Sequence, residues 1–320
     1  MNFEIPVLKN STYNLSKFDF SEFSIRILNI QSDDFKEYIK NLNPGFEKGN
    51  FSFFDLITEN IHNELDSRFA IIKDNYKQFS KQEIYNVYTI LLILFPSGLQ
   101  LENIVHFVEE ENFVQRSSMS SLETKYTTID NYLYFDDEFL EEANEFINLV
   151  FQRINFNNYI GLSIENYLNS FNVSHLHFSY ITLCMSLENL ISGNQELSYR
   201  LKRTMSILCG NTEENSSLIF KNLGKIYNLR SKIVHGEIYK AQDIYTKIEY
   251  LQSLVSRTLI ELLIHNISTN KDLDILITSL GFGQRNRLSE NWKLYKINIL
   301  TFHKIKIELK IETKIEKQNF

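Results

Sequence analysis

The sequence contains little glycine and little proline: ten Gly and three Pro in 320 residues. An all-β architecture rich in turns needs more of both, so the shortage disfavours that class. What remains are long uninterrupted segments in a chain that is 43% hydrophobic and 13% aromatic. Such a composition can fill a sizeable core without disulfides or structural metals. We therefore predict a mainly α protein.

Cysteine is also scarce. Cys184 and Cys209 both fall inside apolar helical patterns, with no Cys or His nearby at metal-ligand spacing, so reduced thiols in the cytosol are expected. The longest apolar run, Val87 to Phe95, is far below the ~20 residues of a membrane span. Met1 to Asn10 does not follow the charged-then-apolar pattern of a leader. We expect a cytoplasmic protein that contacts no membrane.

The net charge of −7 argues at first against a polyanionic partner. Its distribution argues the other way. The segment from Tyr199 to Lys240 contains eight basic and three acidic residues. Its net charge is therefore +5, and the rest of the chain carries −12. This basic segment is a candidate binding surface for a nucleic acid.

The first part of the chain, residues 1–135, is predicted to be a largely helical N-terminal domain, for which we expect a sensing or regulatory role. Alternation of apolar and polar residues near 23–30 indicates a short β segment. Residues 111–134 are polar and typical of a loop or linker, which places a domain boundary near 135. Helical patterns are predicted at about 53–76, 81–95 and 99–110, the second closed by Pro96.

Helical periodicity returns in residues 136–270, and the short polar breaks there favour antiparallel neighbours in a helical bundle. Residues 271–320 form a C-terminal extension. In it, residues 304–312 alternate apolar and charged side chains, which indicates a short strand that pairs with 23–30, an edge segment awaiting a partner, or a frayed tail. The helices of the bundle region are predicted at about 137–154, 157–170, 173–192, 195–210, 215–235 and 241–268.

Arg230 lies on an apolar helical stripe. Its neighbours on the stripe recur at steps of four, three, four and three, so the guanidinium emerges from the apolar face. A buried charge is costly unless it is paired, so Arg230 needs either an acidic partner or a crevice. The stripe consists of Ile219, Leu223, Ile226, Arg230 and Ile233.

Glu188 is the expected partner, because it follows Ile181 and Met185 at the edge of another apolar stripe. The pair could serve only to pin two helices together. The functional alternative gains from His235, which precedes Gly236, a residue typical of a helix stop. In a regular helix a five-residue step separates two side chains by about 140° and about 7.5 Å along the axis. Arg230 and His235 can therefore converge only where a helix ends or where two helices meet.

Three segments in order, at 186–190, 196–201 and 227–236, resemble the successive signatures of the ApeA-like HEPN family, and the similarity covers about 155–265. The resemblance implies a bundle of four or five helices, an Arg-x4–6-His nuclease motif formed here by Arg230 and His235, and a two-fold dimer. It further implies a ribonuclease of a toxin–antitoxin or antiphage system, with an antitoxin or regulatory protein as a further partner. The predicted supporting residues are Ser231, Glu188 and Arg200, and the predicted RNA-binding residues are Lys225, Lys232 and Arg203.

The residue types suit RNA cleavage without metal or cofactor. RNA supplies its own nucleophile, the 2′-hydroxyl, so the protein needs to move protons and stabilise a pentavalent phosphorane. His235 is the expected acid or base, and the Arg230 guanidinium can bind two phosphate oxygens at once. The products would be a 2′,3′-cyclic phosphate and a 5′-hydroxyl, from tRNA or mRNA. The alternative is a non-catalytic HEPN module that binds nucleotide or RNA, or only dimerises.

Overall fold

The computed structural model describes residues 2–11, 13–42, 67–74, 80–110, 113–121, 137, 140–173, 175–191, 196–210 and 212–281. These residues are mainly helical. The chain divides into two compact units, Met1–Phe151 and Gln152–Phe320, and each is described by itself. This division lies after the predicted boundary near 135, because helix α4 (Leu140–Val150) belongs with the first unit.

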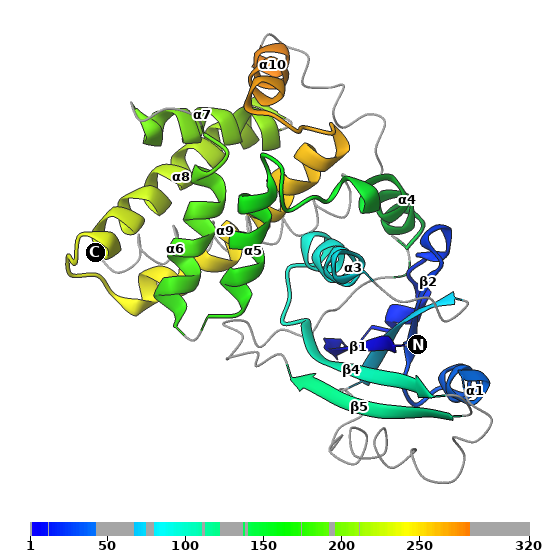
Figure 1. The fold of residues 1–320 in the computed structure, drawn as a ribbon. Helices are drawn as coiled ribbons and strands as arrows, with labels where there is room; N and C mark the ends of the chain where they lie inside the picture. Colours follow the sequence, from blue (N-terminus) through cyan, green and yellow to red (C-terminus); the bar gives the residue numbers. More distant parts are fainter. Residues whose placement is uncertain are drawn as a thin grey trace. The chain divides into compact units, whose positions relative to one another are not determined.

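The first unit contains a five-stranded antiparallel sheet with the strand order β2-β3-β1-β4-β5 (Figure 1). Helix α1 (Asp33–Leu42) packs its Phe35 and Ile39 side chains on one face of this sheet, where strand residues that alternate along the chain supply the other half of the core. The strands are β1 (Asn2–Ser11), β2 (Ile25–Asn29), β3 (Ser67–Lys73), β4 (Gln100–Glu110) and β5 (Phe113–Ser121).

One of the predicted helices in this unit is wrong, and another is wrong over the part that the structure describes, since residues 53–66 lie outside the described residues. Part of the segment 53–76 is strand β3, and 99–110 is almost entirely β4, which pairs with β1 nearly a hundred residues earlier. Both segments carry short apolar runs that periodicity alone assigns poorly, and their β-branched and aromatic residues favour a strand once partners exist. The loop predicted at 111–134 also contains a strand, β5.

Two other predictions for this unit are confirmed. The β segment expected near 23–30 is β2, and the helix expected at 81–95 is α3 (Lys81–Leu94). Helix α3 begins with a reciprocal capping box, in which Ser80 accepts from the Glu83 backbone and the Glu83 carboxylate accepts from the Ser80 backbone. It ends just before Pro96, the breaker on which the prediction depended.

In the described part of the second unit all regular elements are helical, and a short 3₁₀ helix, Phe151–Arg153, lies at the division between the units. The five helices predicted between 157 and 268 are all present, with their ends displaced by a few residues. The helix α10 was not predicted; it begins the C-terminal extension and packs on α7. The helices are α5 (Gly161–Phe171), α6 (Leu176–Glu188), α7 (Leu197–Cys209), α8 (Glu213–Val234), α9 (Ala241–Ile264) and α10 (Asn270–Gly281).

Helix α9 is the centre of this unit. It contacts α5, α6, α7 and α8, and every residue from Tyr250 to Leu263 is buried. In Figure 1, α9 passes behind α5 and α6. A helix that is buried all round is typical of the middle of a bundle, and the burial of α9 leaves the neighbouring helices to carry the unit's surface.

Small polar residues fix α6 against its neighbours. The Ser163 and Ser186 hydroxyls each lie 2.7 Å from the other residue's backbone carbonyl, which brings α5 and α6 close together. The Tyr180 hydroxyl donates to the Ile226 carbonyl of α8 at 3.0 Å. Gly210 allows the tight passage from α7 to α8, because a Cβ there would collide with Ser216. These contacts set the position of the last turn of α6 beside α8.

No helix in the described ranges is long and apolar enough to cross a membrane. The strand predicted at 304–312 lies outside the described residues.

Candidate functional site

The expected contact between Glu188 and Arg230 is confirmed. Glu188 is the last residue of α6, and Arg230 lies one turn before the end of α8. The Arg230 Nη2 atom donates to the Glu188 Oε2 atom at 3.0 Å. The two side chains keep 23% and 14% of their surface exposed, respectively, so the pair lies at the border between core and solvent.

This ion pair uses only part of its hydrogen-bonding capacity. The Arg230 Nε and Glu188 Oε1 atoms are buried and have no hydrogen-bond partner among the described residues. An arginine and a carboxylate can form two parallel hydrogen bonds, and this pair forms one. A further acceptor, such as a phosphate oxygen, could reach the exposed part of the Arg230 side chain but not the buried Nε atom.

Tyr227 supports Arg230 from one turn earlier on α8. The Arg230 Cζ atom lies 5.7 Å from the centroid of the Tyr227 ring, within cation–π range. Burial raises the pKa of Tyr227, and the nearby Glu188 carboxylate raises it further. The phenol therefore stays neutral near pH 7 and holds the guanidinium in place without competing for its charge.

Cys184 lies beneath the pair, one turn before Glu188. The thiol is buried, and burial raises its pKa; Glu188 raises it further while Arg230 opposes the shift. The thiolate is the reactive form of cysteine, and it is suppressed here. Cys184 is thus part of the core under the site and not a nucleophile.

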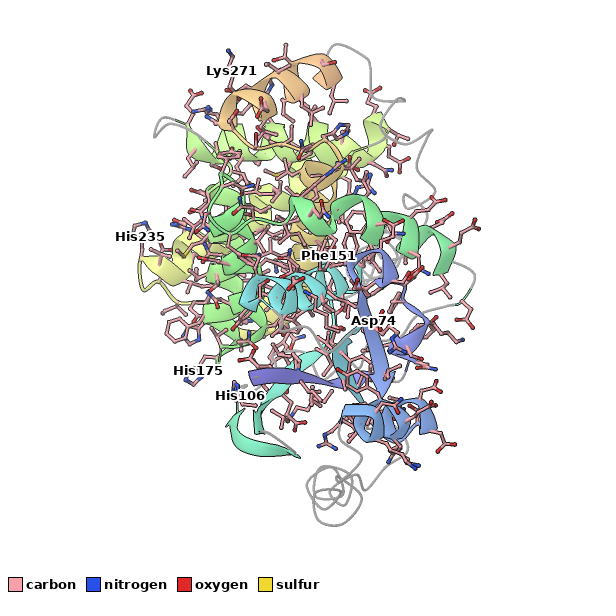
Figure 2. All side chains as sticks on the ribbon, turned by 45° about the vertical axis from the view of Figure 1, so that its right-hand side comes forward. Asp74, His106, Phe151, His175, His235 and Lys271 are labelled. Atoms are coloured by element: carbon pink, nitrogen blue, oxygen red, sulfur yellow. The ribbon has the colours of Figure 1, made fainter. Side chains whose placement is uncertain are left out.

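His235 ends α8 in a Schellman arrangement. The Gly236 N–H donates to the Ile233 carbonyl and the Glu237 N–H to the Lys232 carbonyl. Gly236 has φ +69°, a left-handed conformation that favours glycine, so the predicted helix stop is confirmed. The His235 side chain is exposed, and Figure 2 shows it at the outer edge of the second unit, where α8 ends.

Arg230 and His235 do not converge within one chain. Helix α8 continues without a break to Val234, so the two side chains point about 140° apart. His235 instead continues an exposed stripe that recurs at steps of four, three, four and three and lies roughly opposite Arg230. We call this the lysine stripe; it consists of Lys221, Lys225, Asn228, Lys232 and His235.

The other predicted site residues are distributed around this arrangement. Lys225 and Lys232 belong to the lysine stripe and so lie on the far side of α8 from Arg230. Ser231 is half-buried next to Arg230 in the sequence, and Arg200 is half-buried in the first turn of α7. Arg203 is exposed on α7. The structure therefore brings Arg230 and Glu188 together, but not the lysines with Arg230.

Sequence reasoning missed Tyr227 and Cys184 as neighbours of the pair. Both were within reach of a spacing argument, because Tyr227 is three residues before Arg230 and Cys184 four before Glu188. Within the described residues there is no cluster of three or more His, Cys, Asp or Glu side chains that could hold a metal ion.

Comparison with protein-family models, with curated proteins and with solved structures gave no match.

Proposed function

We propose that the protein is a metal-independent endoribonuclease of the HEPN type, with Arg230 and His235 as its catalytic residues. The observation that carries the proposal is the state of Arg230: a guanidinium at the border of the core, anchored by one bond to Glu188 and by the Tyr227 ring. The Arg230 side chain keeps 23% of its surface exposed, so a ligand can reach it, and a purely structural ion pair needs no such access.

In the proposed reaction His235 takes the proton of the 2′-hydroxyl, and the 2′-oxygen attacks the adjacent phosphorus. The bond from phosphorus to the 5′-oxygen breaks, and that oxygen receives a proton. The pentavalent intermediate carries extra negative charge on its non-bridging oxygens, which Arg230 stabilises. The products are a 2′,3′-cyclic phosphate and a 5′-hydroxyl, and none of these steps draws on a bound metal.

We propose further that the active form is a two-fold homodimer. Arg230 and His235 diverge within one chain, and the reaction needs both a base and an acid, which two copies of His235 would supply. The surface next to Arg230 is suited to a partner: Met185 lies one turn from Glu188 and Val234 one turn from Arg230, with 42% and 50% of their surface exposed. Just beyond the helix stop, Ile238 is 97% exposed.

The dimer has a direct test. Met185→Glu and Val234→Asp should each produce a monomer in analytical ultracentrifugation and abolish cleavage. Ile275→Glu is the matched control, because Ile275 is an equally exposed apolar side chain on α10, 60% exposed, and should leave both properties unchanged. A parent protein that cleaves RNA as a clean monomer at micromolar concentration would contradict the dimer.

The nuclease itself is tested with total RNA in the presence of chelator. The parent should cleave, His235→Ala should not, and the ends should be cyclic phosphates and 5′-hydroxyls. His175→Ala is the matched control, since His175 is also an exposed histidine at a helix end, the start of α6. Equal cleavage by parent and His235→Ala would sink the proposal.

A non-catalytic module that binds nucleotide or RNA, or only dimerises, is the second candidate. The exposed lysines favour it as much as they favour a nuclease. It predicts RNA binding without cleavage and with no effect of His235→Ala. A role as a toxin or antiphage effector, with an antitoxin or regulatory protein and with tRNA or mRNA as substrate, is part of our proposal for the nuclease and depends on the same experiment.

A further inference from the structure

We infer that an aromatic platform on α7 and α8, centred on Tyr199, binds single-stranded nucleic acid by stacking one of its bases. The inference rests on the proposed function only in taking RNA as the ligand, and it names the form of RNA that the site accepts. Neither Tyr199 nor Phe220 belongs to the proposed catalytic pair.

The platform is built where α7 packs on α8. The Tyr199 ring meets the Phe220 ring edge to face, with centroids 6.1 Å apart and an interplanar angle of 76°. This contact fixes the orientation of Tyr199 while 52% of the residue stays exposed. An exposed aromatic ring held by a second ring is a preorganised surface for a flat apolar ligand.

Lys202 places a positive charge at the same spot. Its Nζ atom lies 4.7 Å from the centroid of the Phe220 ring. Its aliphatic stem runs past Gly224, where a Cβ atom would lie 3.8 Å from the Lys202 Cδ atom. The ammonium is therefore held beside the platform and can meet a phosphate next to a stacked base.

The lysine stripe begins at Lys221, about 100° round α8 from Phe220, and ends at His235. Lys221 is adjacent to Phe220 in the sequence, and the stripe runs along α8 for about 21 Å to His235. Within the described residues, neither Lys221 nor Lys225 nor Lys232 is ion-paired with an acidic side chain. A single strand can use such a surface, because one of its bases can stack on the ring while its phosphates contact lysines that have no acidic partner in the part of the chain that the structure describes.

The exposed aromatic ring should favour single-stranded RNA over an RNA duplex. In an RNA duplex the base faces are already stacked on one another, so an exposed ring on the protein has nothing to stack on. In a single strand every base offers an open face, whatever its identity, so binding should tolerate many sequences. The platform thus predicts a preference for unpaired RNA such as loops and tails.

The experiment measures binding of the full-length His235→Ala protein by fluorescence anisotropy. The probes are an unstructured RNA of mixed uridine and cytidine, and an RNA duplex of the same length. Tyr199→Ala should weaken binding of the single strand about 5- to 150-fold, the range of one base–aromatic stack, and leave binding of the duplex unchanged. Tyr199→Phe should bind like the parent.

Phe178→Ala is the matched control, because Phe178 is an aromatic residue of α6 that is 53% exposed and contacts the His175 and His177 rings. It should bind both probes normally. An unchanged single-strand affinity in Tyr199→Ala would overturn the platform, as would an equal loss for the duplex. Poly-glutamate that binds as tightly as the single strand, and equally well to Tyr199→Ala, would also overturn it and indicate an acidic protein as ligand.

The two proposals can fail separately. Binding that depends on Tyr199 in a protein that never cleaves RNA would keep the platform and reject the nuclease. Cleavage that depends on His235 but not on Tyr199 would do the reverse.

Discussion

Two arginine–glutamate pairs in the second unit have the same chemistry and opposite surroundings. Arg230 and Glu188 join two helices at the border with solvent, with 23% and 14% of their side-chain surface exposed. Arg257 and Glu261 are one turn apart on α9, and their side chains keep only 8% and 3% exposed. The first pair can reach a ligand and the second cannot. Our proposal therefore gives a function to the Arg230–Glu188 pair and only a structural role to the Arg257–Glu261 pair.

The electrostatics of the Arg257–Glu261 pair, which we call the inner pair, agree with a structural role. Burial raises the pKa of Glu261, although Arg257 opposes the shift, so the cost of desolvating the carboxylate exceeds the benefit of its partner. His265 lies 3.8 Å from Glu261, and burial lowers its pKa. A buried pair of this kind stabilises little in itself but is costly to break.

The largest effect is expected for Arg230→Lys. Lysine keeps a positive charge next to Glu188 but loses the planar fork that can hold two phosphate oxygens. Cleavage should fall about 10²- to 10³-fold, as when one donor to a transition-state oxyanion is removed. The free energy of unfolding should change by no more than about 1 kcal/mol. Normal cleavage by a well-folded Arg230→Lys protein would contradict the catalytic role proposed for Arg230.

The inner pair should show the reverse behaviour. Arg257→Ala leaves the Glu261 carboxylate buried and unpaired, so it should lower the free energy of unfolding by about 3–5 kcal/mol. The double variant Arg257→Leu/Glu261→Leu should recover most of that loss, because it removes both charges. Chemical denaturation measures both. A double variant as unstable as the single one would show that the pair does more than fill the core.

The exposed lysine stripe and the buried Arg257–Glu261 pair should also differ in how they affect the salt dependence of RNA binding. If three or four exposed cations contact phosphates, the slope of log affinity against log salt is about −2 to −3 for single-stranded RNA. Neutralising Lys225 and Lys232 to Gln should flatten it by about one unit in the His235→Ala background. Arg257→Leu/Glu261→Leu serves as the control and should leave the slope unchanged. A slope near zero would remove the lysine stripe as an RNA surface and favour the non-catalytic module.

The smallest effect concerns pH. The pKa of His265 is lower in the folded chain than its ordinary value of 6.5, so the unfolded chain binds the proton more readily. Stability that is present above pH 6.5 should therefore be lost as the pH falls through that value. His265→Asn should reduce the difference in denaturation midpoint between pH 7.5 and pH 5.5. An unchanged difference would assign the pH dependence to groups other than His265, and Glu261 is not among them, because its raised pKa acts with the opposite sign.

Sequence reasoning reached the Arg230–Glu188 pair because the relevant signals are local. A helical stripe is defined by spacing alone, and a charge on an apolar stripe needs an oppositely charged partner on a helix that packs against it. The stop at Gly236 is equally local, since it depends on the conformational freedom of one residue. These features could be predicted before any tertiary contact was known.

The sheet of the first unit could not be predicted in the same way. Phe69 to Ile72 in β3 are all buried, so the segment shows no alternation to distinguish it from a buried helix. Its partner β1 lies about sixty residues earlier, beyond any local pattern. The platform was missed for a related reason: Tyr199 and Phe220 meet only through the packing of α7 on α8.

Helix α8 runs for 22 residues without interruption, and within it Phe220 and the end at His235 are held at a constant separation. In the proposed nuclease this helix would set the distance between the bound base and the cleaved bond. A strand that is fixed by one base at Tyr199 would present the same phosphate to His235 each time, so fragment ends would fall at a set distance from the stacked base.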